Sequence, residues 1–549
     1  MPSSEASRPA AAPLALAAIG AVLVGAWCIR AVPLLWHQDT CHYLELAASL
    51  ARGDGYHSAL NLFPDLIQPP LYPLALAALI RAGASPVGAA TAICLGAAAL
   101  TAVGLVRLHE ALWGARGRLF AAAVGAASPV LALADGLESE PLFLLLALLA
   151  LLAAIGALRR RSAAIAALAG LAAGGALLTR PEGVLVAAVL ALLLAATGSG
   201  LGRAARVAAF GLALGAVATP YGLWVRARTG HFEVLPKLRF NRLLADVTAA
   251  LPDEPGVPLA AKEMRALNSL MPDHATFILS RAFEDPGFDP RPLFPRVARS
   301  AAGRAIDLLR HDREVLSDAA RRTGLLHPLA LALSIAAFVA GTRRARPVET
   351  RVGVVALALL AFALLLPALL AGDAYELRFL AGATLFSLPL VAGGATLVAD
   401  AVARRAGRPL AVEALLATLL FAAFAALTTR LAVTNAGGPA SHERSSLITD
   451  ACRRLLPEGA RVVADHARCG WLAHGASLQL PTVDDLGALG DYLAAHRARY
   501  LLLDGRTLRR NPSAPVRGLI DPATWPRGWR ALATLPPVGG DPLYLVELP

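Results

Sequence analysis

An acidic side chain follows the first long apolar segment of the chain, in the run His37-Gln38-Asp39-Thr40-Cys41-His42-Tyr43. A carboxylate at this place can act as a general base and take a proton from a hydroxyl group. Asp39 is therefore a candidate catalytic base. An ordinary helix N-cap is the alternative, because aspartate is favoured at that position and a helical pattern follows it. His37 and His42 could bind a metal together with Asp39, but three such ligands without a fourth are weak support for a metal site.

Two further acidic residues, Glu138 and Glu140, precede Pro141 at the start of another apolar segment. Carboxylates two positions apart do not share a helix face, so we expect only one of them at a given site. A polar turn in which Pro141 begins the next helix is the structural alternative. In the run Thr179-Arg180-Pro181-Glu182-Gly183, between two short apolar segments, the arginine and glutamate are expected chiefly to pair and to close a helical hairpin.

A basic residue, Arg378, opens a late apolar segment in the run Asp373-Ala374-Tyr375-Glu376-Leu377-Arg378-Phe379. The forked donors of a guanidinium group match a phosphate. A surface pair with Glu376 or Asp373 is the alternative. A long polar loop offers further candidates for the same anion site: Lys237, Arg239 and Asn241.

The elements that carry these residues are membrane helices. Only 16% of the 549 residues are charged, 56% are hydrophobic, and the mean hydropathy is +0.57. A soluble domain of this size needs more charge on its surface, and the apolar residues form blocks near the ~20 residues that cross a membrane. The net charge of +12 does not indicate nucleic-acid binding, because the arginines cluster in short loops and no nucleic-acid motif accompanies them.

The apolar blocks predict about eleven spans by the usual length of a membrane helix. They are 13–35, 86–106, 118–134, 141–158, 162–178, 183–198, 204–223, 324–341, 352–371, 379–400 and 409–430. Every second loop is short and rich in arginine, which is typical of cytoplasmic loops. The complementary loops, with long ones at 36–85 and 224–323, and the C-terminal tail are then external. A positive residue outside, such as Arg378, runs against this bias and favours a functional role.

The external segments contain structure of their own. Helical spacing predicts a helix over Cys41–Arg52, and an apolar run ending at Arg81 predicts an interfacial helix that is too short to span. In the tail, helices are expected at Ser441–Leu455 and Asp485–Arg497, and strands at Arg461–Ala464 and Arg499–Asp504. The expected fold class is mainly α: a polytopic bundle over 1–430 with a small external α/β domain over 431–549. The spacing of Cys452 and Cys469 allows either a disulfide or two free thiols. The tail lacks a glycine-rich phosphate loop, so a nucleotide site is not expected there.

An ordered set of these motifs resembles the GT-C superfamily of membrane glycosyltransferases, in the branch of protein O-mannosyltransferases and aminoarabinose transferases. The resemblance covers roughly residues 13–430. Besides Asp39 and Arg378-Phe379, it is carried by these segments: Tyr43-Leu44-Glu45-Leu46-Ala47, Gly53-Asp54-Gly55-Tyr56, Pro69-Pro70-Leu71-Tyr72-Pro73, Ser139-Glu140-Pro141-Leu142-Phe143 and Leu177–Gly183. Thr40 departs from the adjacent acidic pair that is common in the family.

The resemblance implies an inverting hexosyl- or pentosyltransferase that uses a polyprenyl-phosphate sugar donor and a hydroxyl acceptor. Asp39 would be its base, Glu140 its second acidic residue, and Arg378 its contact with the lipid phosphate. The substrate-binding candidates are Arg378, Lys237, Tyr43, Arg180 and Glu182. No cofactor is required by the motifs, and a divalent metal stays open. Alanine, arginine and leucine dominate the composition, which favours a bacterial plasma membrane, with the site and the tail on its external face.

Two other functions are consistent with external cations on a membrane protein. A transporter or flippase of a lipid-linked sugar should carry internal repeats and charges at mid-membrane depth, and the sequence has neither. A relative that has lost its activity is the other alternative, and the presence of both Asp39 and Arg378 argues against it.

Overall fold

The computed structural model describes most of the chain. The described residues are 11–31, 38–57, 68–128, 131, 136–237, 328–343, 345–365, 377–406, 409–435, 438–464, 468–478, 480, 485–508 and 514–549. Contacts divide the chain into two units, which are described separately. The helix-bundle unit comprises Met1–Ala31, Thr91–Leu223 and Pro295–Val433; the sheet-containing unit comprises Val32–Ala90, Trp224–Phe294 and Thr434–Pro549.

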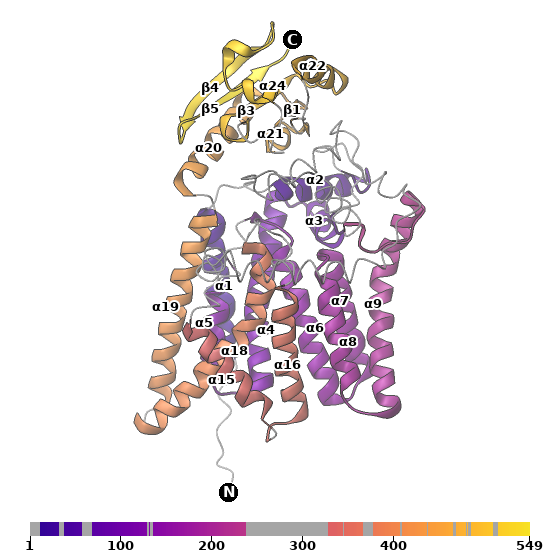
Figure 1. Ribbon diagram of the computed structural model, residues 1–549. Coiled ribbons are helices and arrows are strands. Elements are labelled where there is room, and N and C mark those ends of the chain that lie inside the picture. Colours follow the sequence, from indigo (N-terminus) through magenta and orange to yellow (C-terminus); the bar gives the residue numbers. More distant parts are fainter. Residues whose placement is uncertain are drawn as a thin grey trace. The chain divides into compact units, whose positions relative to one another are not determined.

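Apolar helices make up the helix-bundle unit, and they run side by side (Figure 1). They are α1 (Ala11–Ala31), α4 (Pro86–Trp113), α5 (Arg118–Ala126), α6 (Glu140–Arg160), α7 (Ala163–Thr179), α8 (Gly183–Ala196), α9 (Gly200–Thr229), α15 (Pro328–Thr342), α16 (Val348–Ala363), α18 (Leu377–Ala406) and α19 (Pro409–Asn435). Each predicted span overlaps one of them, although α5 covers only the first part, Arg118–Ala126, of the span predicted at 118–134. Six helices in the described part of the chain are long and apolar enough to cross a membrane, and the others are shorter.

Small residues set the packing inside this bundle. Lipid tails are as apolar as leucine, so membrane helices associate mainly through close contact of their surfaces. Gly170 and Gly174 of α7 allow α9 to approach: a Cβ at Gly174 would lie 2.9 Å from the Cβ of Val217, and one at Gly170 would clash with the carbonyl oxygen of Phe210. Helix α6 is buried along most of its length against its neighbours.

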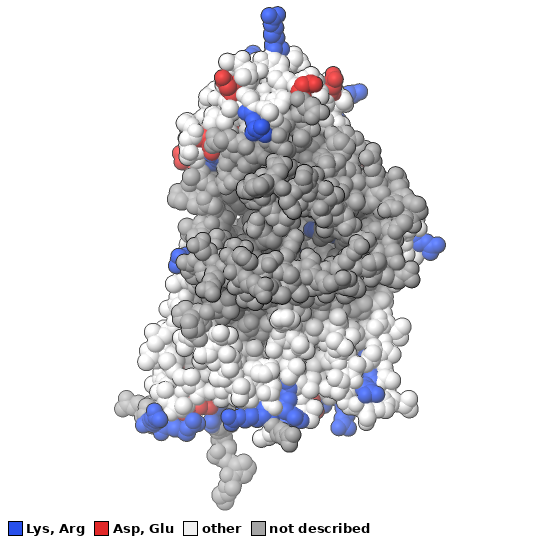
Figure 2. Space-filling model, in the orientation of Figure 1, with Lys and Arg blue, Asp and Glu red and all other residues white. Residues whose placement is uncertain are grey.

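The arginine-rich loops of this unit gather at one end of the bundle, where Figure 2 shows a band of Lys and Arg side chains. This follows from the antiparallel order of the helices, because α4, α6, α8, α15 and α18 all end in these loops. Glu110 binds two of the arginines: Arg107 at 3.0 Å, and Arg118. The clustering matches the alternation predicted from the sequence, while the side of the membrane on which it lies remains a prediction.

The sheet-containing unit combines helices with a five-stranded sheet of order β2-β1-β3-β5-β4. Its helices are α2 (Gln38–Arg52), α3 (Leu71–Arg81), α20 (Gly438–Leu455), α21 (Arg468–Leu472), α22 (Leu486–Ala495), α23 (Gly505–Leu508) and α24 (Ala514–Gly518). Its strands are β1 (Arg461–Val463), β2 (Ala476–Leu478), β3 (Tyr500–Asp504), β4 (Arg530–Val538) and β5 (Asp541–Glu547). Strands β2, β1 and β3 are parallel, and β5 is antiparallel to both β3 and β4.

The helices and strands expected in the tail are present, but the hairpin of β4 and β5 was not predicted. Gly539 and Gly540 form its two-residue turn, with φ of 64° and 81°. Positive φ at both turn positions is typical of hairpins and suits glycine. Pro536 and Pro537 obscured the strand pattern, and they fall where the register of the pair shifts. Proline is tolerated there because it cannot donate to the ladder.

Candidate functional site

Asp39 lies in the first turn of α2, which begins at Gln38. Its side chain is partly buried, and Thr40 and Cys41 beside it are fully buried. The predicted helix after Asp39 is confirmed, with its start three residues earlier than expected. A negative charge is favourable in the first turn of a helix, because the backbone N–H groups there point towards it. The first turn of α2 is therefore a favourable place for an acidic side chain.

A helical hairpin of α2 and α3 fixes the position of Asp39. Tyr43 packs edge-on against Tyr72, with ring centroids 5.2 Å apart, and both rings are buried. At the other end of α2, Arg81 donates hydrogen bonds to the carbonyl oxygens of Leu50 (2.8 Å) and Ala51 (3.1 Å). The last turn of a helix leaves carbonyls without a helical partner, and Arg81 supplies a donor to that of Ala51. The Leu50 carbonyl accepts from Arg81 and also from the backbone N–H of Gly53 at 3.2 Å. The predicted interfacial helix is α3, and its arginine has this capping role.

A second cluster lies in the helix-bundle unit, at the end opposite the arginine-rich loops. Arg180 pairs with Glu182 through two bonds, of 2.9 Å and 3.3 Å, and also with Glu140. The pair with Glu182 was predicted, and the contact with Glu140 was not. Glu140 begins α6 and Arg180 follows α7, so the antiparallel packing of these helices brings the two charges together. In the described part of the chain, Glu140 Oε2 is buried without a hydrogen-bond partner.

The cationic candidates are less fully described. Arg378 is the second residue of α18, at the end of that helix opposite Arg404 and Arg405, and only its backbone is described. Lys237 is partly buried and belongs to the sheet-containing unit, as Asp39 does. Several residues named from the sequence lie outside the described ranges: His37, Arg239, Asn241, Asp373 and Glu376.

Sequence reasoning missed an aromatic group in the sheet-containing unit. Tyr56 packs edge-on against Trp224 at 5.6 Å, and Arg228 lies over the Trp224 ring at 5.4 Å from its centroid. The Tyr56 hydroxyl donates to the carbonyl oxygen of Gln68 at 2.8 Å. A tryptophan directly after a predicted span was the available signal, because aromatic residues are enriched where membrane meets water.

Sequence reasoning also missed Arg468, a buried arginine that opens α21. It lies beside Cys41 of α2, and α21 and α2 are in contact. Burial raises the pKa of the Cys41 thiol to about 12, against a partial lowering by the positive charge of Arg468. Burial also lowers the pKa of Arg468 to about 10, which leaves the guanidinium protonated near neutral pH. No local pattern around residue 468 signals a contact with the first external segment.

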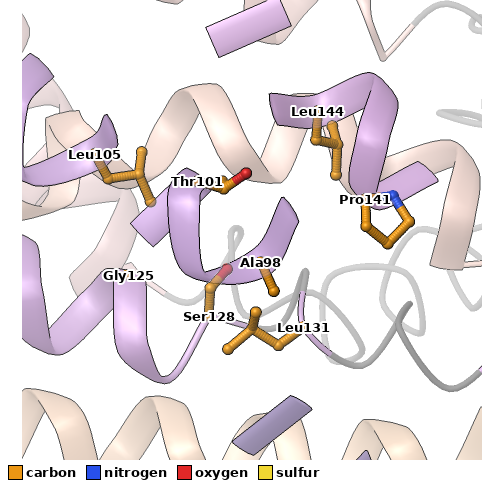
Figure 3. A pocket seen from close by; sticks show the side chains of 8 residues that line it. All are labelled: Ala98, Thr101, Leu105, Gly125, Ser128, Leu131, Pro141 and Leu144. Atoms are coloured by element: carbon orange, nitrogen blue, oxygen red, sulfur yellow. The ribbon is translucent and has the colours of Figure 1, made fainter. Parts of the chain in front are cut away.

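A metal site is not evident among the described residues. They contain no group of three or more His, Cys, Asp and Glu side chains that could hold a metal ion. A cavity of about 20 Å³ lies between α4, α5 and α6, bordered by the hydroxyl groups of Thr101 and Ser128 (Figure 3). That volume suits about one water molecule and is too small for a sugar or a lipid.

No protein-family model matches the chain, and no characterised protein matches it by sequence. Its structure is similar to that of the Archaeoglobus fulgidus oligosaccharyltransferase in the apo form, with a TM-score of 0.59 and 14% identity over 92% of this chain and 70% of that one. For the same enzyme with an inhibitory peptide and a dolichol-phosphate, the TM-score is 0.55 at 14% identity, over 91% of this chain and 69% of that one. For ArnT from Cupriavidus metallidurans bound to undecaprenyl phosphate, it is 0.48 at 13% identity, over 97% of both chains.

The protein is a polytopic membrane protein with the GT-C fold. The resemblance noted in the sequence is confirmed at the level of the fold. At these identities the likeness defines the fold, and the reaction has to be argued from the residues of this chain.

Proposed function

We propose that this protein is an inverting glycosyltransferase that moves a sugar from a polyprenyl-phosphate carrier to an acceptor hydroxyl group, at the external face of a bacterial plasma membrane. The likeness in fold to an oligosaccharyltransferase that binds a dolichol-phosphate carries the proposal. A partly buried carboxylate in the first turn of α2 and an arginine at the start of α18 supply the two kinds of group that the reaction needs.

Asp39 is the general base of the proposed reaction. Its carboxylate takes the proton from the acceptor hydroxyl while that oxygen forms a bond to the anomeric carbon. The bond between the anomeric carbon and the phosphate oxygen breaks, and its electron pair stays on the departing polyprenyl phosphate. One displacement inverts the anomeric configuration.

Arg378, with Lys237 as a second cation, stabilises the negative charge that grows on the leaving phosphate. Fixed charges aimed at such a group commonly contribute a few kcal/mol, roughly, in the transition state. Tyr43 supports Asp39 from the same helix by its packing on Tyr72.

The ion-paired cluster orients the sugar in this proposal. Arg180 is held by Glu140 and Glu182, so its position is defined by two carboxylates. Among the described residues the buried Glu140 Oε2 has no hydrogen-bond partner, and we propose it as an acceptor for a sugar hydroxyl. Its contribution is smaller than that of Asp39, because it forms a contact and takes no part in bond breaking.

Transfer from radiolabelled polyprenyl-phosphate sugars, in membranes that contain the protein, tests the proposal. We expect labelled product with the wild type and a loss of about 10²-fold or more in Asp39→Asn, the usual contribution of a general base. Asp54→Asn is the matched control: Asp54 follows α2 and pairs with the exposed Arg52 at 2.7 Å. Exposed pairs of this kind contribute little to stability, so the control should keep its activity.

The outcomes separate the alternatives. No product from any donor would favour transport of a lipid-linked sugar over transfer. Product that persists undiminished in an inserted, folded Asp39→Asn variant would point to another carboxylate, and Glu140 would be the next to test.

A further inference from the structure

The C-terminal part of the chain touches the helix that carries Asp39. Helix α21 contacts α2 within the sheet-containing unit. Arg468, which opens α21, is 4% exposed, and Cys41 of α2, whose thiol lies near enough to respond to the charge of Arg468, is 0% exposed. Cys41 lies two positions after Asp39, about 3 Å further along the axis of the same helix. Any shift of α2 at Cys41 therefore moves Asp39 as well.

Arg468 is itself held from the other side by α20. Its Nη1 donates to the carbonyl oxygen of Ser445 at 3.1 Å and to the hydroxyl of the same residue. A disulfide joins the next residue, Cys469, to Cys452 of α20. The hydrogen bonds and the disulfide are two independent links between α21 and α20. They fix the position of the guanidinium group on α21.

Burying the guanidinium group of Arg468 costs free energy, because a charged group is removed from water. An apolar side chain would fill the same space without that cost. Arg468 donates hydrogen bonds to the hydroxyl and carbonyl groups of Ser445. Such contacts are directional and hold one geometry, whereas an apolar contact tolerates sliding. The presence of a buried arginine in spite of this cost is therefore consistent with a role in fixing the positions of the elements around it.

We propose that Arg468 is a positioning residue, which holds the first turn of α2 through Cys41 and so keeps Asp39 aligned for proton transfer. The inference rests on the proposed function only in the assignment of Asp39 as the base. A base misplaced by about 1 Å can lose about 10²-fold in rate while the substrate still binds. Loss of Arg468 should therefore lower kcat and leave the KM for the lipid donor unchanged.

The test uses the full-length protein with three variants, Arg468→Met, Arg468→Lys and Arg461→Met. We expect kcat to fall at least tenfold in Arg468→Met with the donor KM within twofold of wild type, and to recover partly in Arg468→Lys. Arg461 is an exposed arginine of the same domain that bonds the carbonyl of His496 at 2.9 Å, and its variant should match the wild type. An unchanged kcat in Arg468→Met, or an equal loss in Arg461→Met, would overturn the proposal.

A second readout does not depend on catalysis. Alkylation of Cys41 by a maleimide, mapped by mass spectrometry, should be slow in the wild type and at least fivefold faster in Arg468→Met. This measurement stands even if the wild type transfers no sugar, which separates the inference from the proposed function. Equal alkylation in both would refute the contact. If Arg468→Met fails to fold, Ser445→Ala replaces it, because this variant removes one hydrogen-bond acceptor of the guanidinium group. It should also lower kcat and speed the alkylation of Cys41, each to a smaller degree.

Discussion

Arg180 in the helix-bundle unit and Arg468 in the sheet-containing unit are both largely buried, but they have different neighbours. Arg180 is bound by two carboxylates, Glu140 and Glu182, which offset the cost of removing its charge from water. Arg468 contacts the hydroxyl and carbonyl groups of Ser445 and lies beside the thiol of Cys41. Burial lowers the pKa of Arg468 accordingly.

The difference separates two uses of a buried charge. At Arg180 one guanidinium group is shared by two carboxylates, so its removal leaves both acidic side chains without this cation. At Arg468 the guanidinium group donates to the hydroxyl and carbonyl groups of Ser445, so its removal breaks directional hydrogen bonds that fix its place. We therefore expect changes at Arg180 to act on stability first and changes at Arg468 to act on turnover first.

The largest expected effect on stability comes from Arg180→Met. Removing one member of a buried ion pair typically costs about 3–5 kcal/mol, because the remaining charges stay buried. Thermal unfolding in detergent should show the loss, together with a low yield of inserted protein. The double variant Arg180→Met with Glu140→Gln should lose less than the two single variants combined. Strictly additive losses would mean that the pair does not couple.

The disulfide of the sheet-containing unit should have the next largest effect. Cys452 and Cys469 are 17 residues apart, and closing a loop of that size stabilises a protein by about 3 kcal/mol. The double variant Cys452→Ser with Cys469→Ser should unfold at a lower temperature in this unit and should no longer respond to a reducing agent. A wild type that is itself insensitive to reduction would contradict the expectation.

Close helix packing in the bundle predicts a smaller loss for Gly170→Ala. A Cβ there would clash with the carbonyl oxygen of Phe210, and overpacking of this kind costs about 1–3 kcal/mol. Gly215→Ala is the matched control, because its Cβ would meet nothing within 4 Å and it lies in α9, the helix that Gly170 faces. Equal unfolding temperatures for the two variants would show that α7 and α9 separate readily.

The smallest effect concerns Cys41 and alkaline pH. Burial raises the pKa of this thiol from 9.0 to about 12, so the folded protein holds its proton more tightly than the unfolded chain. The protonated thiol therefore contributes to the free energy of unfolding. This contribution is fully present below about pH 9 and is lost as the pH rises towards 12. Alkylation of Cys41 in the folded protein should stay slow at pH 9–10, where an unfolded thiol reacts. Rapid alkylation at that pH would show that the thiol is accessible.

Much of the fold could be predicted from the sequence. Each predicted span overlaps an apolar helix, because long apolar blocks leave a membrane protein few alternatives to a helix. Helix α2 and the helices and strands expected in the tail were found within a few residues. The hairpin of β4 and β5 was missed, since its prolines broke the alternation that identifies a strand.

The site was less predictable. The pairing of Arg180 with Glu182 follows from their closeness in sequence, whereas its contact with Glu140 spans 40 residues. The disulfide was one of two possibilities that the spacing of Cys452 and Cys469 allowed. The contact of Arg468 with α2 had no local signal at all. Asp39, Arg378 and Lys237 remain predictions about function that the experiments above address.

Hydropathy and the placement of arginine determined, from the sequence by itself, that this is a polytopic membrane protein with basic loops at one end of its helices and a mixed α/β tail. These properties are local, because each apolar block and each charged loop carries its own preference for lipid or water. Only the tertiary structure decided which charges meet. Arg180 reaches Glu140 because α6 and α7 pack antiparallel. Arg468 lies near Cys41 because α21 packs on α2, and both arrangements depend on the packing of whole elements.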